Sequence, residues 1–256
     1  NKTHCCPMGA DSDWIHMGDS GRLRAWLLAM AVAILGVALM TGMGLASIGN
    51  STFPPYRTPN FAWLRYLLGG LMFGIGMTLA SGCGNKTLVR IGGGNIKSLV
   101  VLIIASLCAY LMLWTEFYGQ VFNSWVVATT VDLGKSGFQS QAVSEFFGAG
   151  TTPQVATGAV LGLILAGFVF ASKDFRGNFD NILGGLVIGL AVVIGWYLTA
   201  GPMGAAWKEW AELAETVPSR VEVQSFTFIS PMGDTARYLM SPGNFANINF
   251  GATALA

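Results

Sequence analysis

Five long stretches of the chain are apolar on every side, and polar or glycine-rich segments separate them. The stretches fall at residues 24–47, 63–82, 97–114, 154–171 and 182–200. Each is close to the about 17–25 residues that a helix needs to cross the hydrocarbon core of a bilayer. The pattern therefore predicts an all-α polytopic membrane protein, with residues 1–256 forming a single transmembrane domain in the lipid bilayer.

Two segments between these stretches are mixed in character. Segment 115–153 combines polar residues with apolar groups at Trp125 and Phe146, and it predicts a loop with an interfacial or re-entrant helix. Segment 201–228 carries six charged residues and predicts a solvated loop with a short helix. Charged residues make up only 11% of the 256 residues, against about 25% in soluble domains. The net charge of +1 gives no sign of nucleic-acid binding.

Lysine and arginine residues crowd the loops on one side of the expected helices. Seven of them precede the first span or lie between the second and third and between the fourth and fifth, whereas five are spread over longer loops on the other side. Because basic loops face the cytoplasm, we expect loops 83–97 and 172–181 to be cytoplasmic and 201–228 to be periplasmic. This count changes if the stretch 63–82 ends midway across the membrane.

A glycine-flanked cysteine interrupts the chain where the second apolar stretch ends. The run SGCGNKTLVRIGGG places Cys83 between Gly82 and Gly84, with Lys86 and Arg90 shortly after it. Irregular backbone at membrane depth occurs where protein buries it or where it lines a polar cavity, and broken segments mark transporter binding sites. These residues are therefore candidates for binding an anion or a sulfur compound. Lys86 and Arg90 also fit a plainer reading, as ordinary cytoplasmic charges.

The remaining cysteines have simpler interpretations. Cys108 lies inside an apolar run, where we expect a small buried hydrophobic residue. Cys5 and Cys6 are adjacent near the start, where the plainer interpretation is a reactive but incidental pair at a frayed end. Four cysteines at these spacings predict no disulfide framework. Without a Cys-x-x-Cys pair, and with two histidines, they predict no metal site and no cofactor. A nucleotide site is excluded because Asn85 stands before the lysine, where a phosphate loop requires glycine.

Two short motifs each occur twice along the chain. Pro-Met-Gly begins at Pro7 and again at Pro231, 224 positions later, and Gly-Gly-Leu begins at Gly69 and at Gly184. Two inverted halves would make this order regular, with about 1–150 as most of the first repeat and 151–256 as the start of the second. That arrangement predicts broken or re-entrant short helices and a chain truncated at both ends. Matches this short also arise by chance in a glycine-rich membrane protein, so both readings stay open.

Three stretches of the sequence resemble the YeeE/YedE family of sulfur-transport membrane proteins. They are Cys6–Asp13, Gly69–Gly94 and Ser225–Asp234. The resemblance implies a permease of the bacterial inner membrane that takes up thiosulfate or a related sulfur-containing ion through a cysteine-lined constriction. It also implies a pseudo-two-fold fold whose short helices meet there, and a small cytoplasmic sulfur-carrier protein as partner. The chain departs from the family because the second glycine–cysteine loop is not within it. The candidate substrate-binding residues are Cys83, Cys6, Gly82, Gly84, Lys86 and Arg90.

Thiol chemistry suits a conduit for a sulfur dianion. A neutral thiol is a weak hydrogen-bond donor that adds no charge, and a conduit must release what it binds. A proline after Cys6 presets a helix start, which aims backbone N–H groups at an anion. Burial raises a cysteine pKa and a helix N-terminus lowers it, so the sequence leaves the protonation state of Cys83 open.

We expect a permease without enzymatic activity, and two other functions compete with it. A membrane sulfurtransferase would carry sulfur as a persulfide on Cys83 or Cys6, which requires an activated thiolate; His4 is the candidate partner. A structural subunit of a larger membrane complex is the third reading. The aspartates near the two Pro-Met-Gly turns are interpreted as helix caps and solvated charges, with proton coupling as the minor alternative. They are Asp11, Asp13, Asp19 and Asp234.

Overall fold

The computed structural model describes residues 6–46, 58–148, 150–213, 223 and 225–240. Its helices are α1 (Pro7–Met17), α2 (Gly21–Gly42), α3 (Trp63–Leu79), α4 (Gly84–Gly92), α5 (Ile96–Trp114), α6 (Phe117–Val121), α7 (Asn123–Ala128), α8 (Thr151–Phe170), α9 (Lys173–Gly177), α10 (Phe179–Ala200), α11 (Pro202–Leu213) and α12 (Ile229–Met240). Two 3₁₀ turns, η2 (Leu133–Ser136) and η3 (Val143–Phe147), join them. Two short strands, β1 (Asn60–Phe61) and β2 (Val131–Asp132), pair antiparallel with Asn60 opposite Asp132.

Five stretches of the described chain are long and apolar enough to cross a membrane. They are α2, the stretch Trp63–Gly92 that holds α3 and α4, then α5, α8 and α10. The predicted all-α polytopic membrane fold is therefore confirmed, with each predicted span overlapping one of these stretches. Segment 115–153 contains the short helices α6 and α7, the strand β2, both 3₁₀ turns and the start of α8, and segment 201–228 contains the expected short helix, α11.

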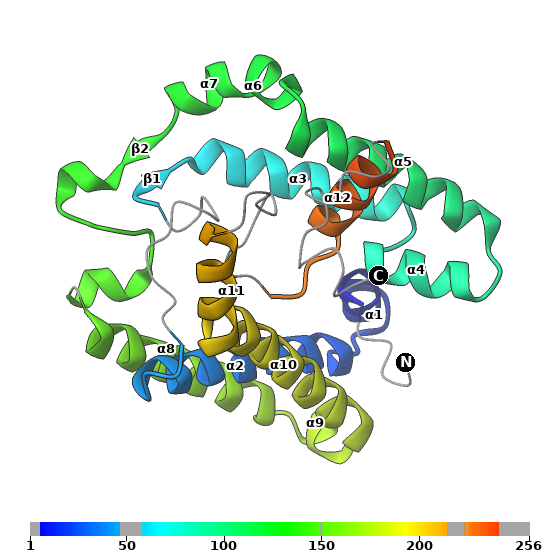
Figure 1. The fold of residues 1–256 in the computed structure, drawn as a ribbon. Helices are drawn as coiled ribbons and strands as arrows, with labels where there is room; N and C mark the ends of the chain where they lie inside the picture. Colours follow the sequence, from blue (N-terminus) through cyan, green and yellow to red (C-terminus); the bar gives the residue numbers. More distant parts are fainter. Residues whose placement is uncertain (1–5, 47–57, 149, 214–222, 224, 241–256) are drawn as a thin grey trace.

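The helices α2, α8 and α10 form one packed unit, in which α2 lies between the other two (Figure 1). On α10, a Cβ added at Gly185 or Gly189 would lie 2.7 Å from the carbonyl oxygen of Ala25 or 2.8 Å from that of Ala29. The spacing Gly185-x-x-x-Gly189 is the small-residue motif that lets membrane helices approach closely. Tight contact between α10 and α2 therefore depends on the missing side chains.

The contact between α8 and α2 uses the same device. An added Cβ at Gly162 would lie 2.6 Å from Cγ of Leu35, and one at Gly158 would lie 3.1 Å from Cβ of Ala38. These two glycines again stand four residues apart on one face of the helix. The glycine faces of α8 and α10 thus both pack closely against α2.

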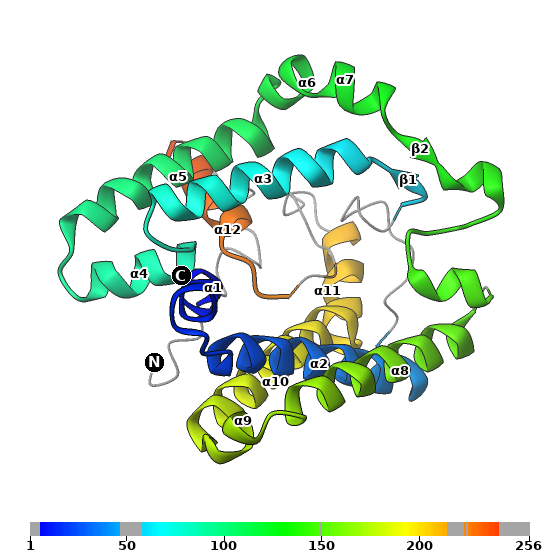
Figure 2. The same ribbon diagram turned by 180° about the vertical axis from the view of Figure 1, so that it is seen from behind.

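A second group of helices, α3, α5 and α12, lies apart from the first, with α1 and α4 adjacent to one another between the groups (Figures 1 and 2). α12 packs on α5 where Gly233 removes a side chain, since a Cβ there would lie 3.2 Å from the carbonyl carbon of Ala109. The indole N–H of Trp114 donates to Asp234 (2.9 Å), and the Arg237 guanidinium lies 3.7 Å from the centre of the Trp114 ring. These contacts hold the short helix α12 against the long helix α5.

Candidate functional site

The candidate site begins at the ordered turn between α3 and α4. The N–H of Gly82 donates to the carbonyl of Met77 (2.9 Å). The N–H of Ser81 donates to the carbonyl of Thr78 (3.2 Å). This pair of bonds is the Schellman motif that closes many helices. Ser81 adopts its left-handed conformation (φ 59°), and Gly82 follows with φ 150°. The chain thus leaves α3 by a defined turn and begins α4 at Cys83.

Cys6 and Cys83 occupy the N-cap positions of α1 and α4, and their thiols meet. Both residues have extended backbone conformations, and Pro7 is the first residue of α1, as its fixed φ favours. The two Sγ atoms are 4.0 Å apart, although 77 positions separate the residues in the sequence. The structure therefore brings together two of the predicted site residues from different stretches of the chain.

The N-termini of α1 and α4 carry no conventional cap. Among the described residues, neither the Cys6 nor the Cys83 side chain makes a side-chain cap hydrogen bond. A cysteine sulfur is a weak acceptor, whereas serine, threonine, aspartate and asparagine satisfy the first N–H groups of a helix well. Each helix N-terminus also carries roughly half a positive elementary charge. Two such ends facing one another form an environment that favours an anion.

A third short helix, α12, reaches the same point. A Cβ added at Gly84 would lie 3.3 Å from Cε of Met232 and 3.3 Å from Cβ of Phe228. Phe228 immediately precedes α12, and its carbonyl accepts the N–H of Met232 (3.3 Å). The first turn of α12 therefore abuts the first turn of α4, and the small size of Gly84 permits this approach. Both Pro-Met-Gly turns of the sequence consequently lie next to the Cys83 turn.

We call the place where Cys6, Cys83 and Gly84 come together, at the starts of α1 and α4, the thiol junction. A cavity of about 610 Å³ opens beside it. It runs between α3, α5 and the start of α12, and Gly82, Cys83 and Gly84 line one end of it. Most of its other lining residues are apolar, and Cys108 of α5 is among them. Cys108 is exposed, so the interpretation of Cys108 as a buried hydrophobic residue is wrong. The sequence of α5 is so uniformly apolar that no periodic pattern reveals which face of the helix borders a cavity.

The two predicted basic residues lie at different distances along α4 from the thiols. Lys86 is in the first turn, and its side chain passes over Gly82, since a Cβ on Gly82 would lie 2.6 Å from Cδ of Lys86. Arg90 is in the last turn of α4, about 10 Å along the helix from Cys83 at 1.5 Å per residue. There its charge complements the negative end of the helix dipole. The structure thus brings Lys86 to the junction and leaves Arg90 away from it.

The electrostatic surroundings of Cys6, which lies outside the five membrane-length stretches, favour its thiolate. Burial raises the pKa of the Cys6 thiol, but the backbone N–H groups of Gly9 and Cys83 lower it. The Cys83 thiol and the positive charge of Lys86 lower it further, so the pKa of Cys6 lies below its ordinary value. The same groups that stabilise a thiolate there are available to a bound anion. Cys5 and His4 lie outside the described residues.

The four aspartates near the two turns do not share one role. Asp19 accepts the N–H of Gly21 (2.8 Å) and Asp11 is exposed, as expected for a cap and a solvated charge. Asp13 is 8% exposed and pairs with Arg22 (3.1 Å). Asp234, only 3% exposed, accepts from Trp114. The interpretation as caps and solvated charges is therefore wrong for Asp13 and Asp234, which anchor the two short helices α1 and α12.

No pattern in the sequence predicted the interactions of α12 with Trp114. A charged residue such as Arg237 on a short segment that also carries Pro-Met-Gly was the available signal, but its stacking partner is 123 positions away on α5. Long-range pairing of this kind has no local pattern in the sequence.

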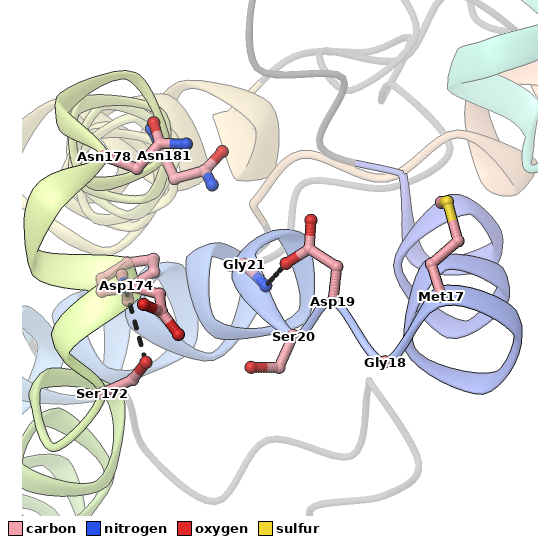
Figure 3. Close-up of a pocket in the computed structure, with 10 residues that line it drawn as sticks. Met17, Gly18, Asp19, Ser20, Gly21, Ser172, Asp174, Asn178 and Asn181 are labelled. Carbon is pink, nitrogen blue, oxygen red and sulfur yellow. Dashed lines mark hydrogen bonds between the residues drawn. The ribbon is translucent and has the colours of Figure 1, made fainter.

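A second, polar cavity of about 410 Å³ lies where α2 and α10 begin (Figure 3). Its lining includes Asp19, Asp174 and Asn181. Two helix ends are capped here: Ser172 accepts the N–H of Phe175 (3.4 Å) at the start of α9, and Asn178 accepts the N–H of Asn181 (3.3 Å) at the start of α10. This cavity therefore offers a control environment with which to compare the thiol junction.

Comparison with known proteins identifies the family to which the chain belongs. A model of the family described as Sulphur transport matches residues 2–255. The thiosulfate transporter TsuA of Escherichia coli (strain K12) is 32% identical over 97 residues, which are 38% of this chain and 25% of that protein. The match thus spans a quarter of the relative's length. The resemblance drawn from the glycine–cysteine loop is confirmed, and this multi-pass membrane protein belongs to the sulphur transport family.

Proposed function

We propose that the protein is a permease that carries thiosulfate or a similar sulfur-containing anion across the bacterial inner membrane. The observation that carries this proposal is the meeting of Cys6 and Cys83 at two helix N-termini, with their Sγ atoms 4.0 Å apart. The junction combines soft sulfur atoms with positive electrostatic potential, and a thiosulfate dianion has a soft terminal sulfur and three charged oxygens. Family membership and the similarity to a thiosulfate transporter support the same class of substrate.

In this proposal each part of the junction has a separate task. Backbone N–H groups at the starts of α1 and α4 attract the sulfonate oxygens. The Cys83 thiol donates a weak hydrogen bond to the terminal sulfur, while Lys86 in the first turn of α4 adds positive charge. Weak contacts allow release, which a conduit requires. The constriction lined by Cys6 and Cys83 is thus a weak, transient binding site along the transport path.

The orientation of the path follows from the loop charges. We propose that loops 83–97 and 172–181 face the cytoplasm and that 201–228 faces the periplasm. An inverted repeat, with Pro7 and Pro231 at equivalent turns, is supported by the position of one turn beside Cys83 and of the other beside Gly84. Arg90, at the far end of α4, would then lie toward the cytoplasmic side. The family resemblance adds a small cytoplasmic sulfur-carrier protein as the proposed recipient.

Uptake of radiolabelled thiosulfate by vesicles that contain the intact protein tests the proposal. Cys83→Ala and Cys6→Ala should each lower uptake by up to about tenfold, because tenfold corresponds to about 1.4 kcal/mol, the upper end of the range for one hydrogen bond. Cys108→Ala, which removes a thiol from the adjoining cavity but not from a helix N-terminus, is the matched control. Equal uptake by the Cys83 variant and the unchanged protein, at equal membrane levels, would refute the role of the junction.

A membrane sulfurtransferase remains the second candidate because the lowered pKa of Cys6 favours a nucleophilic thiolate. In that reaction the Cys6 thiolate attacks the outer sulfur of thiosulfate, forming a persulfide while sulfite leaves. Mass spectrometry after exposure to thiosulfate distinguishes the two functions: a persulfide on Cys6 that forms at the rate of turnover favours sulfur transfer. Uptake of doubly labelled thiosulfate with both sulfur atoms intact favours the permease.

A further inference from the structure

The two junction thiols form a pair whose geometry permits a covalent reaction. Their Sγ atoms are 4.0 Å apart, against about 2.05 Å in a disulfide. We propose that Cys6 and Cys83 are a reversible dithiol–disulfide pair that polythionate dianions oxidise, and that the disulfide closes the path to sulfur anions. The closure rests on the proposed function, whereas the oxidation depends on the thiol pair alone.

Both cysteines have the local freedom that bond formation requires. Each stands at an N-cap in extended backbone, just before its helix begins. Both are partly exposed, and both are free thiols in the structure. Neither side chain makes a full side-chain cap hydrogen bond within the described chain, although the backbone N–H groups of Gly9 and Cys83 lie close enough to the Cys6 sulfur to lower its pKa. Bond formation requires the sulfur atoms to approach by about 2 Å from their separation of 4.0 Å, and rotation about the Cα–Cβ bonds is the movement that would supply this approach.

The site also favours a particular class of oxidant. A polythionate such as tetrathionate is a dianion with a sulfonate group at each end and a sulfur–sulfur bond between them. The helix N-termini and Lys86 that attract thiosulfate in the proposed function attract these sulfonate groups for the same reason. A small neutral disulfide lacks this attraction. The junction should therefore react with tetrathionate in preference to a neutral disulfide reagent.

The reaction balances in two steps. The Cys6 thiolate, having lost its proton to water, attacks a central sulfur of tetrathionate; the central sulfur–sulfur bond breaks and thiosulfate leaves. Cys6 then carries a –S–SO₃⁻ group. Cys83, after losing its own proton, attacks Sγ of Cys6, forming the disulfide and releasing a second thiosulfate. The two thiols lose two electrons in total, and tetrathionate gains them to become two thiosulfate ions.

Cys6 is assigned as the first nucleophile because the local environment favours its thiolate. The N–H groups of Gly9 and Cys83 and the charge of Lys86 lower the pKa of Cys6, and they outweigh the effect of burial. The thiolate is the reactive form in thiol–disulfide exchange. Reaction of Cys6 with tetrathionate should therefore continue to lower pH than reaction of free cysteine in the same buffer.

The consequence for transport is a closed junction. A bridge between Cys6 and Cys83 would tie the first turn of α1 to the first turn of α4 and remove the thiol donor of Cys83. An anion at the helix ends would then encounter a disulfide bond in place of two side chains that can move apart. A reductant of the dithiol class would restore both thiols and reopen the path.

The experiment uses the intact protein carrying Cys5→Ser and Cys108→Ser, so that Cys6 and Cys83 are the thiols left within residues 1–256. On addition of tetrathionate we expect two thiosulfate ions released per chain, loss of both free thiols, and a linked peptide pair containing Cys6 and Cys83. Adding Cys83→Ser should stop the reaction after one thiosulfate, with the adduct on Cys6. Dithiothreitol should restore both thiols in the first variant.

Several results would overturn the inference. They are retention of both free thiols at an excess of tetrathionate, a disulfide between two chains in place of one within a chain, and equal reactivity toward a neutral disulfide reagent. Vesicle uptake separates this inference from the proposed function. Absence of thiosulfate uptake by the reduced protein contradicts the permease, and unchanged uptake after the disulfide has formed contradicts the closure.

Discussion

Two regions of the molecule gather helix N-termini and treat them in opposite ways. At the polar cavity of Figure 3, α9 and α10 begin with Ser172 and Asn178, whose side chains cap them. At the thiol junction, α1 and α4 begin with Cys6 and Cys83, which make no side-chain cap bond within the described residues. The comparison teaches that a helix end becomes available to an anion when its N-cap residue leaves the N–H groups poorly satisfied.

The two regions also differ in charge: acidic side chains line the polar cavity, whereas a lysine lies at the thiol junction. Asp19 and Asp174 line the polar cavity, and carboxylates near helix N-termini stabilise the helices while opposing an incoming anion. At the junction, Lys86 lies in the first turn of α4, close enough to lower the pKa of Cys6. The caps at the polar cavity therefore stabilise α9 and α10, whereas Lys86 at the junction favours a negatively charged group.

The largest expected effect comes from giving α4 an ordinary N-cap, which removes the difference in capping between the two regions. Cys83→Asp should satisfy the first N–H groups of α4 and place a carboxylate at the junction. Two unit charges about 4 Å apart repel by about 4 kcal/mol at an effective dielectric constant of about 20. Uptake of a sulfur dianion should therefore fall by more than about a hundredfold, while a new cap adds about 1 kcal/mol to the stability of the helix.

Vesicle uptake and thermal unfolding of the purified protein check both halves of this prediction. Cys83→Asn is the control, because asparagine caps without adding charge; it should gain the stability and lose less uptake than Cys83→Asp. Uptake by Cys83→Asp at the level of the unchanged protein would mean that the anion does not pass this helix end.

A smaller disturbance moves Lys86 without changing the thiols. At Gly82, with φ 150°, an added Cβ would lie 2.6 Å from Cδ of Lys86. Gly82→Ala should therefore strain the turn by roughly 1–3 kcal/mol and displace the lysine, lowering both uptake and the midpoint of thermal unfolding. Gly177→Ala is the control, because nothing lies within 4 Å of its Cβ position. If Gly82→Ala transports normally, then the position of Lys86 does not matter.

The capped region supplies the next prediction. Asn178→Ala and Ser172→Ala should each lower the stability of the folded protein by about 1 kcal/mol, the usual worth of an N-cap. Uptake per folded molecule should stay the same, because the polar cavity is not part of the proposed path. Calorimetry in detergent and vesicle uptake normalised to folded protein measure the two effects. A specific loss of uptake at normal stability would assign a transport role to this cavity and erase the contrast with the junction.

The sequence predicted what depends on local pattern. Continuous apolar runs located all five membrane-length stretches, and the glycines around Cys83 located the break between α3 and α4. The recurrence of Pro-Met-Gly marked the two turns that lie beside Cys83 and Gly84. In each case neighbouring residues carry the information, because hydrophobic period, glycine and proline act on the chain within a few residues.

What the sequence could not provide is the set of contacts made across long separations. The 4.0 Å approach of Cys6 to Cys83 depends on how α1 and α4 are placed by other helices. Asp13 pairs with Arg22 of another helix, and Cys108 lines a cavity that residues of α3, α5 and α12 form together. A charged residue near a turn and a cysteine in an apolar run look the same in the sequence whether or not another helix arrives beside them.

The smallest predicted effect concerns the turn that delivers the chain to the uncapped end of α4. Ser81 holds a left-handed conformation (φ 59°) at the position of the Schellman motif where glycine is usual. That conformation costs a non-glycine residue roughly 1–2 kcal/mol, and glycine loses about 0.5–1 kcal/mol through its greater freedom in the unfolded chain. Ser81→Gly should therefore raise stability by less than about 1 kcal/mol and leave uptake unchanged. Gly18→Ser, at the left-handed C-cap of α1 (φ 69°), is the reverse control and should lower it. A fall in stability for Ser81→Gly would mean that the serine side chain holds the turn, and the junction would then depend on Ser81 as well as on its two cysteines.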